Sequence, residues 1–327
     1  KGVFHVYGVE ESSRGRPLLL APLLYGTMDR AASHAHEFSS ISHPENYTEI
    51  AFTFDPTLKE PVQVLAALFH HLKKGRAEHG EQPCDVIRLW PMEENSTLLK
   101  TVHAALRAAG FWVQAYPNSY NRFETTEGVD YETYFARRSA NLRSSVRRRQ
   151  RALEKGGRLE LKLYSDPAGL QNAMPDYFTV SKDSWKNMPA MIGFDILDLM
   201  QLAAAKGCLR LGILRVDGEA AATQFWIVTN GVAHCSRLAY RENYKHLAVG
   251  VVLTNFMIAH VLDQDHVLKI DFGYGNDDYK GGWMKEVRNY FGLIAFNPGT
   301  RAGCYYGARH ILGRALKRTV KALLRRK

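Results

Sequence analysis

Residues 269 to 283 gather polar side chains directly after a predicted buried strand. The stretch is KIDFGYGNDDYKGGW and places acids, tyrosines, a lysine and a tryptophan among four glycines. Asp271 ends the strand, at the sheet edge where α/β proteins tend to bind ligands. A carboxylate in that position can hold or deprotonate a nucleophile if burial raises its pKa. Asp271 could equally cap the following turn, Lys280 could be a solvated loop cation, and Trp283 could be a core residue.

Other catalytic and binding signatures do not occur in this sequence. GYGNDD lacks the third glycine of the dinucleotide fingerprint, and the chain has no Walker phosphate-binding sequence and no Gly-x-Ser-x-Gly turn. The histidine pairs 34/36 and 70/71 have no third ligand at a suitable spacing. We therefore expect no metal centre.

Length and composition indicate a folded protein with more than one core. The chain has 327 residues and a mass of 37.0 kDa, which exceeds the usual single-domain size, and 46% of its residues are hydrophobic. The most apolar run, 249–262, is interrupted by polar residues and is too short to span a bilayer. Four separated cysteines and the absence of a leader after Lys1 predict a cytoplasmic protein.

Two short segments carry the positive charge. The net charge is +10, but residues 137–155 contribute +7 and residues 309–327 contribute +8, which leaves the rest of the chain at −5. Both segments have helical periodicity, so each can pack one apolar stripe and expose its cations. The first could be a solvated surface or a phosphate-binding face. The second could dock on the body of the protein or contact an anionic membrane.

The pattern of apolar residues predicts an α/β protein. In the first half, strand-like runs (3–9, 49–54, 85–90 and 111–115) alternate with helical ones (61–74 and 96–109). In the second half we expect a strand at 158–165, two helices, and three strands joined by Asp-Gly (217–218) and Asn-Gly (230–231) hairpin turns. A helix (249–262), a strand (267–272), a helix around 283–290 and a last strand (293–297) follow.

This order is similar to the fold of the GCN5-related N-acyltransferases (GNAT). Three blocks sharpen the resemblance: FARRSANLRSSVRRRQRALEKGGRLELKLY, LAYRENYKHLAVGVVLTNFMIAH and IDFGYGNDDYKGGW. They resemble the landmark blocks of FemAB-like and CelD/BcsL-type acyltransferases (BioF2-like acetyltransferase domain), which carry two GNAT domains in tandem. The resemblance is weak over residues 1–120 and more specific from 131 to 297.

The resemblance implies a fold and a division of the chain. Each domain would be a mixed, mostly antiparallel sheet flanked by helices. We expect an N-terminal GNAT-like domain (1–130), a basic connecting helix (131–157), a C-terminal catalytic domain (158–300) and a basic amphipathic tail (301–327).

The resemblance also implies a donor site at the start of the central helix. Relatives bind the coenzyme pyrophosphate there, where free N–H groups and the helix dipole favour anions. The matching residues are Leu247, Ala248, Val249, Gly250 and Val251, and Gly250 lets the backbone come close. Many relatives have a more glycine-rich loop at this point. The co-substrate would be an acyl-CoA, with acetyl-CoA preferred and no metal involved.

The same resemblance assigns roles to the residues of the polar stretch. Amine acylation needs a neutral nucleophile and a donor for the developing oxyanion. Asp271 would hold or deprotonate the amine, and Tyr279 or Lys280 would stabilise the oxyanion or protonate the leaving thiolate. No covalent enzyme intermediate is needed.

Four more residues are expected to contact the substrate: Arg237, Tyr240, Trp185 and Trp283. Strand alternation places Arg237 on the same face as Cys235 and Ala239, where it could bind an anionic group. The family has an aspartate after the tyrosine, and this chain has Arg241 instead.

Three hypotheses for the function follow. The first is an N-acyltransferase that moves an acyl group from acyl-CoA to an amine, such as an amino sugar of an envelope polysaccharide or a lipid-linked precursor, with the tail 309–327 contacting the inner membrane. The second is an aminoacyl transferase that uses aminoacyl-tRNA, with helix 137–155 contacting RNA phosphates. The third is a catalytically silent scaffold. None of them involves DNA.

Overall fold

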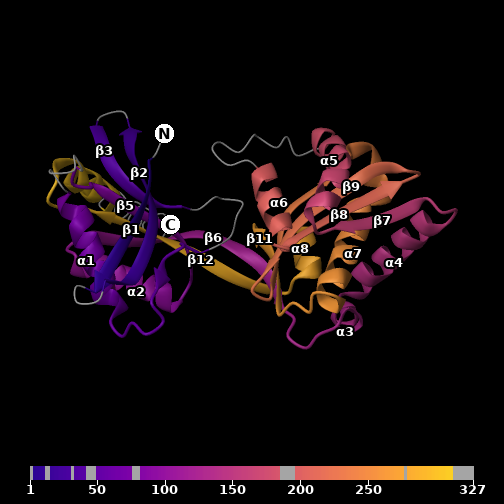
Figure 1. Ribbon diagram of the computed structural model, residues 1–327, viewed down its shortest axis with the longest axis horizontal. Coiled ribbons are helices and arrows are strands. Elements are labelled where there is room, and N and C mark those ends of the chain that lie inside the picture. The colour runs from indigo at the N-terminus through magenta and orange to yellow at the C-terminus, as the bar shows by residue number, and fades with distance from the viewer. Residues whose placement is uncertain are drawn as a thin grey trace, which may run out of the picture. The chain divides into compact units, whose positions relative to one another are not determined.

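The computed structural model describes most of the chain as two compact units (Figure 1). The described residues are 3–11, 15–30, 33–41, 49–75, 82–184, 196–275 and 278–311. Unit 1 consists of Lys1–Tyr120 and Arg288–Lys327, and unit 2 consists of Asn121–Val287. The strands β6 (Trp112–Thr125) and β12 (Glu286–Phe296) each carry the chain from one unit into the other.

Unit 1 is a mixed sheet with helices packed against it. Its elements are β1 (Val3–Glu11), β2 (Arg16–Arg30), β3 (Ser33–Ser40), β4 (Thr53–Phe54), α1 (Pro61–Lys74), β5 (Val86–Glu93) and α2 (Thr97–Ala108). The strand order is β1-β2-β3-β5-β12, β4 pairs with β2, and β3 and β5 are parallel neighbours.

The helices of unit 1 follow local sequence signals. Pro61 occupies the first turn of α1, where its missing N–H costs nothing, and the apolar residues of this helix face the sheet. At α2 the Ser96 side chain accepts a hydrogen bond from the backbone N–H of Leu99, which is a standard N-cap. Both helices had been expected within a residue or two of these bounds.

Unit 2 is a larger mixed sheet with helices on both faces (Figure 1). Its helices are α3 (Tyr131–Ala136), α4 (Ala140–Glu154), α5 (Pro167–Lys182), α6 (Ile196–Ala205), α7 (Val249–Asp263), α8 (Asp278–Trp283) and the short 3-10 helix η2 (Glu242–Leu247). Its strands are β7 (Leu159–Tyr164), β8 (Leu209–Val216), β9 (Glu219–Thr229), β10 (Val232–Tyr240) and β11 (Lys269–Tyr274). The order is β6-β11-β10-β9-β8-β7, and β10 and β11 are parallel neighbours.

Two hydrophobic cores lie on opposite faces of this sheet. One contains α7 with α3 and α4, and the other contains α5 and α6. The hairpin turns that set the register are as expected, because Asp217, Gly218, Asn230 and Gly231 all adopt positive φ.

The two units repeat one order of elements. The set β1-β2-β3-α1-β5-α2-β6 matches β8-β9-β10-α7-β11-α8-β12: a meander, a helix, a strand parallel to the end of the meander, a helix and a final strand. The end of β6 pairs antiparallel with β11 within unit 2, and β12 pairs antiparallel with β5 within unit 1. The predicted α/β class with mixed, mostly antiparallel sheets in tandem is confirmed.

Some local predictions differ from the structure. The helix expected around 283–290 is wrong, because residues 286–296 form strand β12, which pairs with β5 from Tyr290 to Phe296. The division expected at residues 130, 157 and 300 also differs from the observed units, since α4 packs within unit 2 and β12 pairs within unit 1. Strands β2 and β3 were missed.

Residues 301–311 are helical, and most of the predicted tail 309–327 lies outside the described residues. None of the helices in the described part of the chain has the length and hydrophobicity that spanning a bilayer requires.

Candidate active site

The strands β10 and β11 of unit 2 pair over only three residues and then separate. The parallel register runs from Val232 opposite Lys269 to His234 opposite Asp271. Beyond that point β10 remains paired with β9 as far as Tyr240, while β11 is paired with β6 on its other side, up to Tyr274. The sheet therefore opens between the carboxyl ends of two neighbouring parallel strands, which is where α/β proteins bind ligands.

A cavity of about 270 Å³ lies at this opening. Its walls come from the end of β10, the segment leading into α7, the first turns of α7, and α8. The lining residues are Leu238, Tyr240, Lys245, Ala248, Val249, Gly250, Val251, Thr254, Tyr279 and Trp283. Seven predicted site residues are thus brought together: four of the expected donor residues, two of the expected substrate contacts and Tyr279.

Buried polar side chains form hydrogen bonds that support the first turn of α7. Gln224 of β9 is fully buried, and its amide nitrogen donates to Thr254 Oγ1 at 2.6 Å and to the carbonyl of Gly250 at 3.3 Å. Its amide oxygen accepts a hydrogen bond from Trp226 Nε1 at 2.9 Å. Sequence reasoning missed Gln224 and Thr254, although a glutamine within the apolar run AAATQFWIV was a usable signal.

The backbone at the start of α7 leaves room for a ligand. Ala248 adopts a left-handed conformation (φ 51°, ψ 43°), and no side chain caps the helix. A methyl group on Gly250 would lie 3.4 Å from Tyr240, an ordinary contact, so alanine fits there. Leu247 ends η2 and packs against the core instead of lining the cavity.

The carboxylate of Asp271 contacts the neighbouring strand and the turn. The side chain is 2% exposed, and Asn121 Nδ2 donates to both carboxylate oxygens, at 2.9 and 3.0 Å. The backbone N–H of Gly273 donates to Asp271 Oδ1 at 2.8 Å. This geometry is that of a cap on the turn after β11, and Asp271 is not among the residues that line the cavity. Its role as a base stays a prediction.

Lys280 and Tyr279 are adjacent on α8 and point in different directions. Lys280 is buried, and its ammonium group donates to the carbonyl of Tyr274 at the end of β11. Tyr279 is 43% exposed and lines the cavity. Of the two proposed proton donors, Tyr279 is therefore the one beside the cavity.

A β-bulge in β10 changes the expected position of Arg237. Cys235 pairs with Trp226 and Arg237 with Phe225, so Ser236 is an extra residue that interrupts the alternation. Cys235 packs against the core around α7, whereas Ala239 is buried against α5 and α6. The prediction that Cys235, Arg237 and Ala239 share one face is therefore wrong.

Arg237 instead faces α5, opposite the cavity-lining side chains of β10. Burial raises the pKa of Tyr177 on α5, and the nearby charge of Arg237 opposes that shift. An anion-binding role for Arg237 would thus be exercised on the α5 side of the sheet. Trp185, another predicted substrate contact, lies outside the described residues.

Comparison with protein families identifies the type of domain. Residues 140–281 match the family described as acetyltransferase (GNAT) domain. Unit 2 thus carries a GNAT acyltransferase domain. The matched range includes the separated strands, α7 and most of α8, and it contains all the residues that line the cavity except Trp283.

Solved structures of similar fold extend over nearly the whole chain. The C-terminal domain of a protein assigned as lysylphosphatidylglycerol synthetase from Agrobacterium fabrum has a TM-score of 0.57 at 14% identity, covering 94% of this chain and 89% of that one. FemX has a TM-score of 0.55 at 11% identity, covering 90% and 89%. L-PGS from Bacillus licheniformis has a TM-score of 0.54 at 11% identity, covering 94% and 89%. The chain therefore shares the fold of these structures over most of its length, and a search of curated protein sequences found no match.

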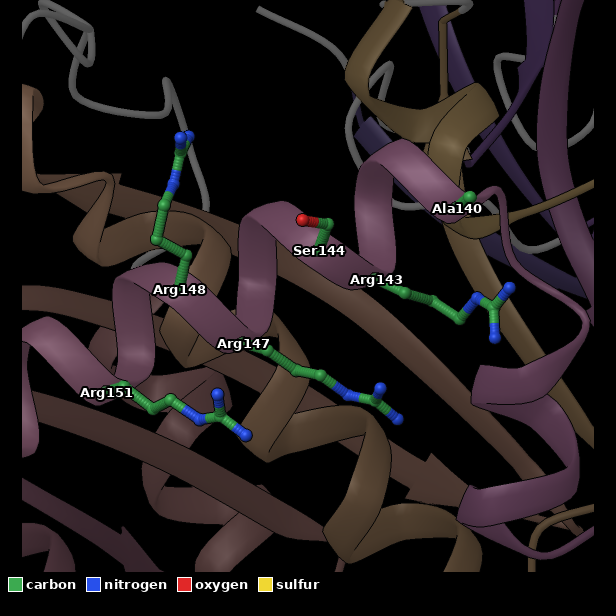
Figure 2. Close-up of a pocket in the computed structure, with 6 residues that line it drawn as sticks. All are labelled: Ala140, Arg143, Ser144, Arg147, Arg148 and Arg151. Atoms are coloured by element: carbon green, nitrogen blue, oxygen red, sulfur yellow. The ribbon is translucent and has the colours of Figure 1, made fainter.

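The GNAT domain also has an arginine-rich surface on α4. A hollow of about 540 Å³ is lined by Ala140, Arg143, Ser144, Arg147, Arg148 and Arg151. In Figure 2 the side chains of Arg143, Arg147 and Arg151 lie side by side, while Arg148 extends in another direction. None of these four arginines forms an ion pair with a described residue.

Within the described residues, no group of three His, Cys, Asp or Glu side chains could hold a metal ion.

Proposed function

We propose that this acyltransferase moves an acyl group, most simply acetyl, from acyl-CoA to an amine acceptor by direct attack in a ternary complex. The observation that carries the proposal is the cavity where β10 and β11 separate, against the uncapped first turn of α7. An extended thioester arm fits between strands that no longer bond to each other. Apolar walls from Leu238, Val249 and Trp283 suit its hydrocarbon part.

Electrostatics at the start of α7 support the same donor. The unpaired N–H groups of a helix N-terminus and the helix dipole favour anions such as the phosphates of the coenzyme. Lys245 lines the same cavity, where its ammonium group is paired with Glu242 at 2.7 Å. A donor phosphate would compete with that carboxylate.

The reaction itself needs only acid–base help. The neutral amine nitrogen forms a new bond to the thioester carbonyl carbon, the C–S bond breaks, and the amine loses a proton. The Tyr279 hydroxyl beside the cavity would supply a proton to the departing thiolate, and its phenolate oxygen would take up the proton that the amine nitrogen loses, which returns Tyr279 to its starting state.

For the acceptor we propose an amino sugar of an envelope or exported polysaccharide, or a lipid-linked precursor. One of the similar structures is named for lysylphosphatidylglycerol synthesis, a name that joins an aminoacyl group to a lipid. Arg237 on the α5 side of β10 would bind an anionic group of the acceptor, which then approaches from the face opposite the donor.

Isothermal titration with acetyl-CoA, a long-chain acyl-CoA and free coenzyme A tests the donor. Gly250→Glu should abolish binding, because it fills the cavity and places a negative charge at the phosphate site. Gly250→Ala is the matched control and should bind like the wild type. Absence of heat with all three compounds would overturn the acyl-CoA proposal.

A second candidate, aminoacyl transfer from aminoacyl-tRNA, is favoured by the arginine surface of α4. Residues four apart on a helix are about 6 Å apart along its axis, so Arg143, Arg147 and Arg151 present a regular row of cations. Binding of tRNA should then weaken steeply with salt, and the triple variant Arg143→Glu/Arg147→Glu/Arg151→Glu should reduce both the affinity and the slope. Unchanged binding in that variant would exclude this surface as the RNA site.

A further inference from the structure

Helix α8 has little intrinsic stability, so it cannot by itself fix the positions of its side chains. It spans six residues, Asp278–Trp283, and two of them are glycines, each of which disfavours a helix relative to alanine. Yet Tyr279 and Trp283 of this helix form one wall of the donor cavity. Their positions must therefore be fixed by contacts from outside α8.

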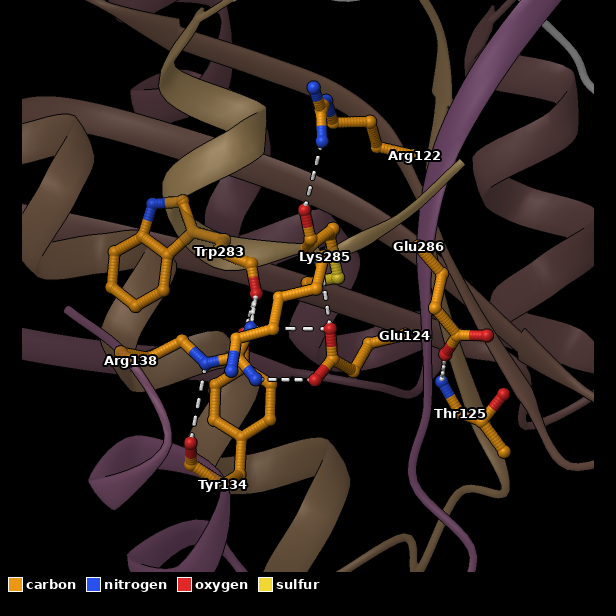
Figure 3. Close-up of polar contacts among 9 residues, drawn as sticks. Arg122, Glu124, Thr125, Tyr134, Arg138, Trp283, Lys285 and Glu286 are labelled. Atoms are coloured by element: carbon orange, nitrogen blue, oxygen red, sulfur yellow. Dashed lines mark hydrogen bonds and ion pairs between the residues drawn. The ribbon is translucent and has the colours of Figure 1, made fainter. Parts of the chain in front are cut away.

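A buried ion pair lies at the carboxyl end of α8 (Figure 3). The Arg138 side chain is fully buried and forms a two-pronged contact with the Glu124 carboxylate, through Nη2 to Oε1 and through Nη1 to Oε2 at 3.2 Å. Arg138 Nη1 also donates to the main-chain carbonyl of Trp283, the last residue of α8. The cation thus satisfies a carbonyl that the end of a helix leaves without an internal partner.

Neighbouring groups complete the attachment. The Tyr134 hydroxyl donates to the same Trp283 carbonyl at 2.6 Å, and the Arg138 guanidinium lies over the Tyr134 ring, 4.3 Å from its centroid. The backbone N–H of Lys285 donates to Glu124 Oε2 at 2.8 Å. The chain on both sides of Met284 is therefore bound to one charged pair.

We propose that the Arg138–Glu124 pair, with Tyr134, positions α8 so that Tyr279 and Trp283 face the acyl donor. The proposal rests on the proposed function, because it assumes that the cavity binds acyl-CoA. Arg138 and Glu124 touch neither the cavity nor the reacting atoms and are positioning residues. A plain apolar contact could fill the same volume, but it could not hold the Trp283 carbonyl and the Lys285 N–H in a fixed direction.

The test uses a double variant that leaves no lone buried charge. Glu124→Leu/Arg138→Met removes both charges and keeps similar volumes, and such replacements of buried pairs commonly preserve the fold. Tyr134→Phe removes one hydrogen bond without changing charge. Hydrogen exchange of the peptide covering 278–286 and titration with acetyl-CoA are measured for each variant.

The expected result is local. In the double variant, exchange at 278–286 should accelerate about tenfold while the strands β8 and β9 keep their protection, and acetyl-CoA affinity should fall about tenfold. Tyr134→Phe should give a smaller change in the same direction. Arg138→Lys, which keeps the charge but not the fork of donors, should lie between the wild type and the double variant.

A rescue experiment separates positioning from general stability. A methyl group on Gly282 would lie 3.7 Å from Leu142, so Gly282→Ala fits and should stiffen α8. Added to the double variant, it should recover most of the lost affinity, while in the wild type it should change little. Unchanged exchange at 278–286 in the double variant, or loss of protection spread evenly over unit 2, would overturn the proposal. Failure of the wild type to bind acetyl-CoA would instead overturn the proposed function, and the exchange data would still test the positioning.

Discussion

The two units contain the same parallel strand pair but complete it differently. In unit 1, β3 and β5 pair from Glu37 opposite Val86 to Ser39 opposite Arg88, over three residues, as β10 and β11 do in unit 2. Ser40 then bridges to Trp90: its hydroxyl donates to the Trp90 carbonyl at 2.6 Å and accepts from the Trp90 N–H at 3.0 Å. In unit 2 the chain beyond the three paired residues leads to the cavity, which is lined by Leu238 and Tyr240 of β10.

Further along β5, beyond its pairing with β3, residues 49 and 50 form hydrogen bonds to this strand. The backbone N–H of Ile50 donates to the carbonyl of Pro91 at 3.1 Å, and the N–H of Glu93 donates to the Glu49 carboxylate at 2.6 Å. After the parallel stretch, unit 1 thus has hydrogen bonds from Ser40, Glu49 and Ile50 to β5, here called the seam, whereas unit 2 has the cavity. The comparison teaches that the order of elements creates the opening, and that the residues after the parallel stretch decide whether a ligand can use it.

The largest expected effect tests whether unit 2 alone binds the donor. Gly250→Glu puts a carboxylate into the first turn of α7 and should weaken acyl-CoA binding at least 100-fold, about 2.7 kcal/mol. Gln63→Glu puts one into the first turn of α1, where Gln63 is exposed, and should leave the affinity within about twofold of the wild type. Isothermal titration measures both, and equal losses would remove the functional difference between the units.

The next effect concerns the buried network that supports the cavity. Gln224→Ala leaves Trp226 Nε1 without its acceptor and Thr254 Oγ1 without a donor in the core. We expect the free energy of unfolding to fall by about 2–3 kcal/mol. Urea unfolding followed by tryptophan fluorescence measures the change, with Thr229→Ala at the exposed end of the same strand as a control. A loss no greater than the control's would show that the network does not support α7.

The seam of unit 1 gives a smaller effect. Ser40→Ala removes both hydrogen bonds to Trp90 and should lower the free energy of unfolding by about 1 kcal/mol. Acyl-CoA binding should not change, because the donor cavity belongs to unit 2. A second, weaker acyl-CoA site appearing in the Ser40→Ala protein would mean that the seam is all that closes unit 1 to ligands.

The smallest effect is a pH dependence of stability that each unit shares. Burial lowers the pKa of His260 on α7 and that of His103 on α2, each from an ordinary value of 6.5; for His260 the charge of Asp265 opposes the shift. A lowered folded-state pKa means that the unfolded chain protonates first, so stability is full above about pH 6.5 and declines as the pH falls below it.

His260→Gln and His103→Gln should each flatten that decline slightly. Urea unfolding at pH 7.5, 6.5 and 5.5 measures the effect, on the order of one proton per histidine in the slope. A decline that neither substitution alters would assign the pH dependence to other groups.

Much of the fold could be predicted from local sequence. The Asp-Gly and Asn-Gly turns, the Ser96 cap and the apolar run of α7 depend on residues close to one another in the chain, so their structure follows from local propensity. The blocks that resemble known acyltransferases located the donor site, and seven of the predicted residues do line one cavity. The assignment failed at Arg237, because a single bulged residue reverses the side-chain alternation that a regular strand would have.

What the sequence by itself determined is the hairpin turns, the helices α1, α2 and α7, the order of elements in the second half and the identity of the side chains near the site. Only the tertiary structure decided that residues 286–296 form a strand, that Asp271 is bound by Asn121 from 150 residues away, and that Arg138 and Glu124 hold the end of α8. The physical reason is that each of these features depends on a partner distant in sequence. The local propensities of a short helix with two glycines, or of a strand whose partner is distant in sequence, are too weak to determine its conformation. That conformation is set by the contacts that the element makes in the folded protein.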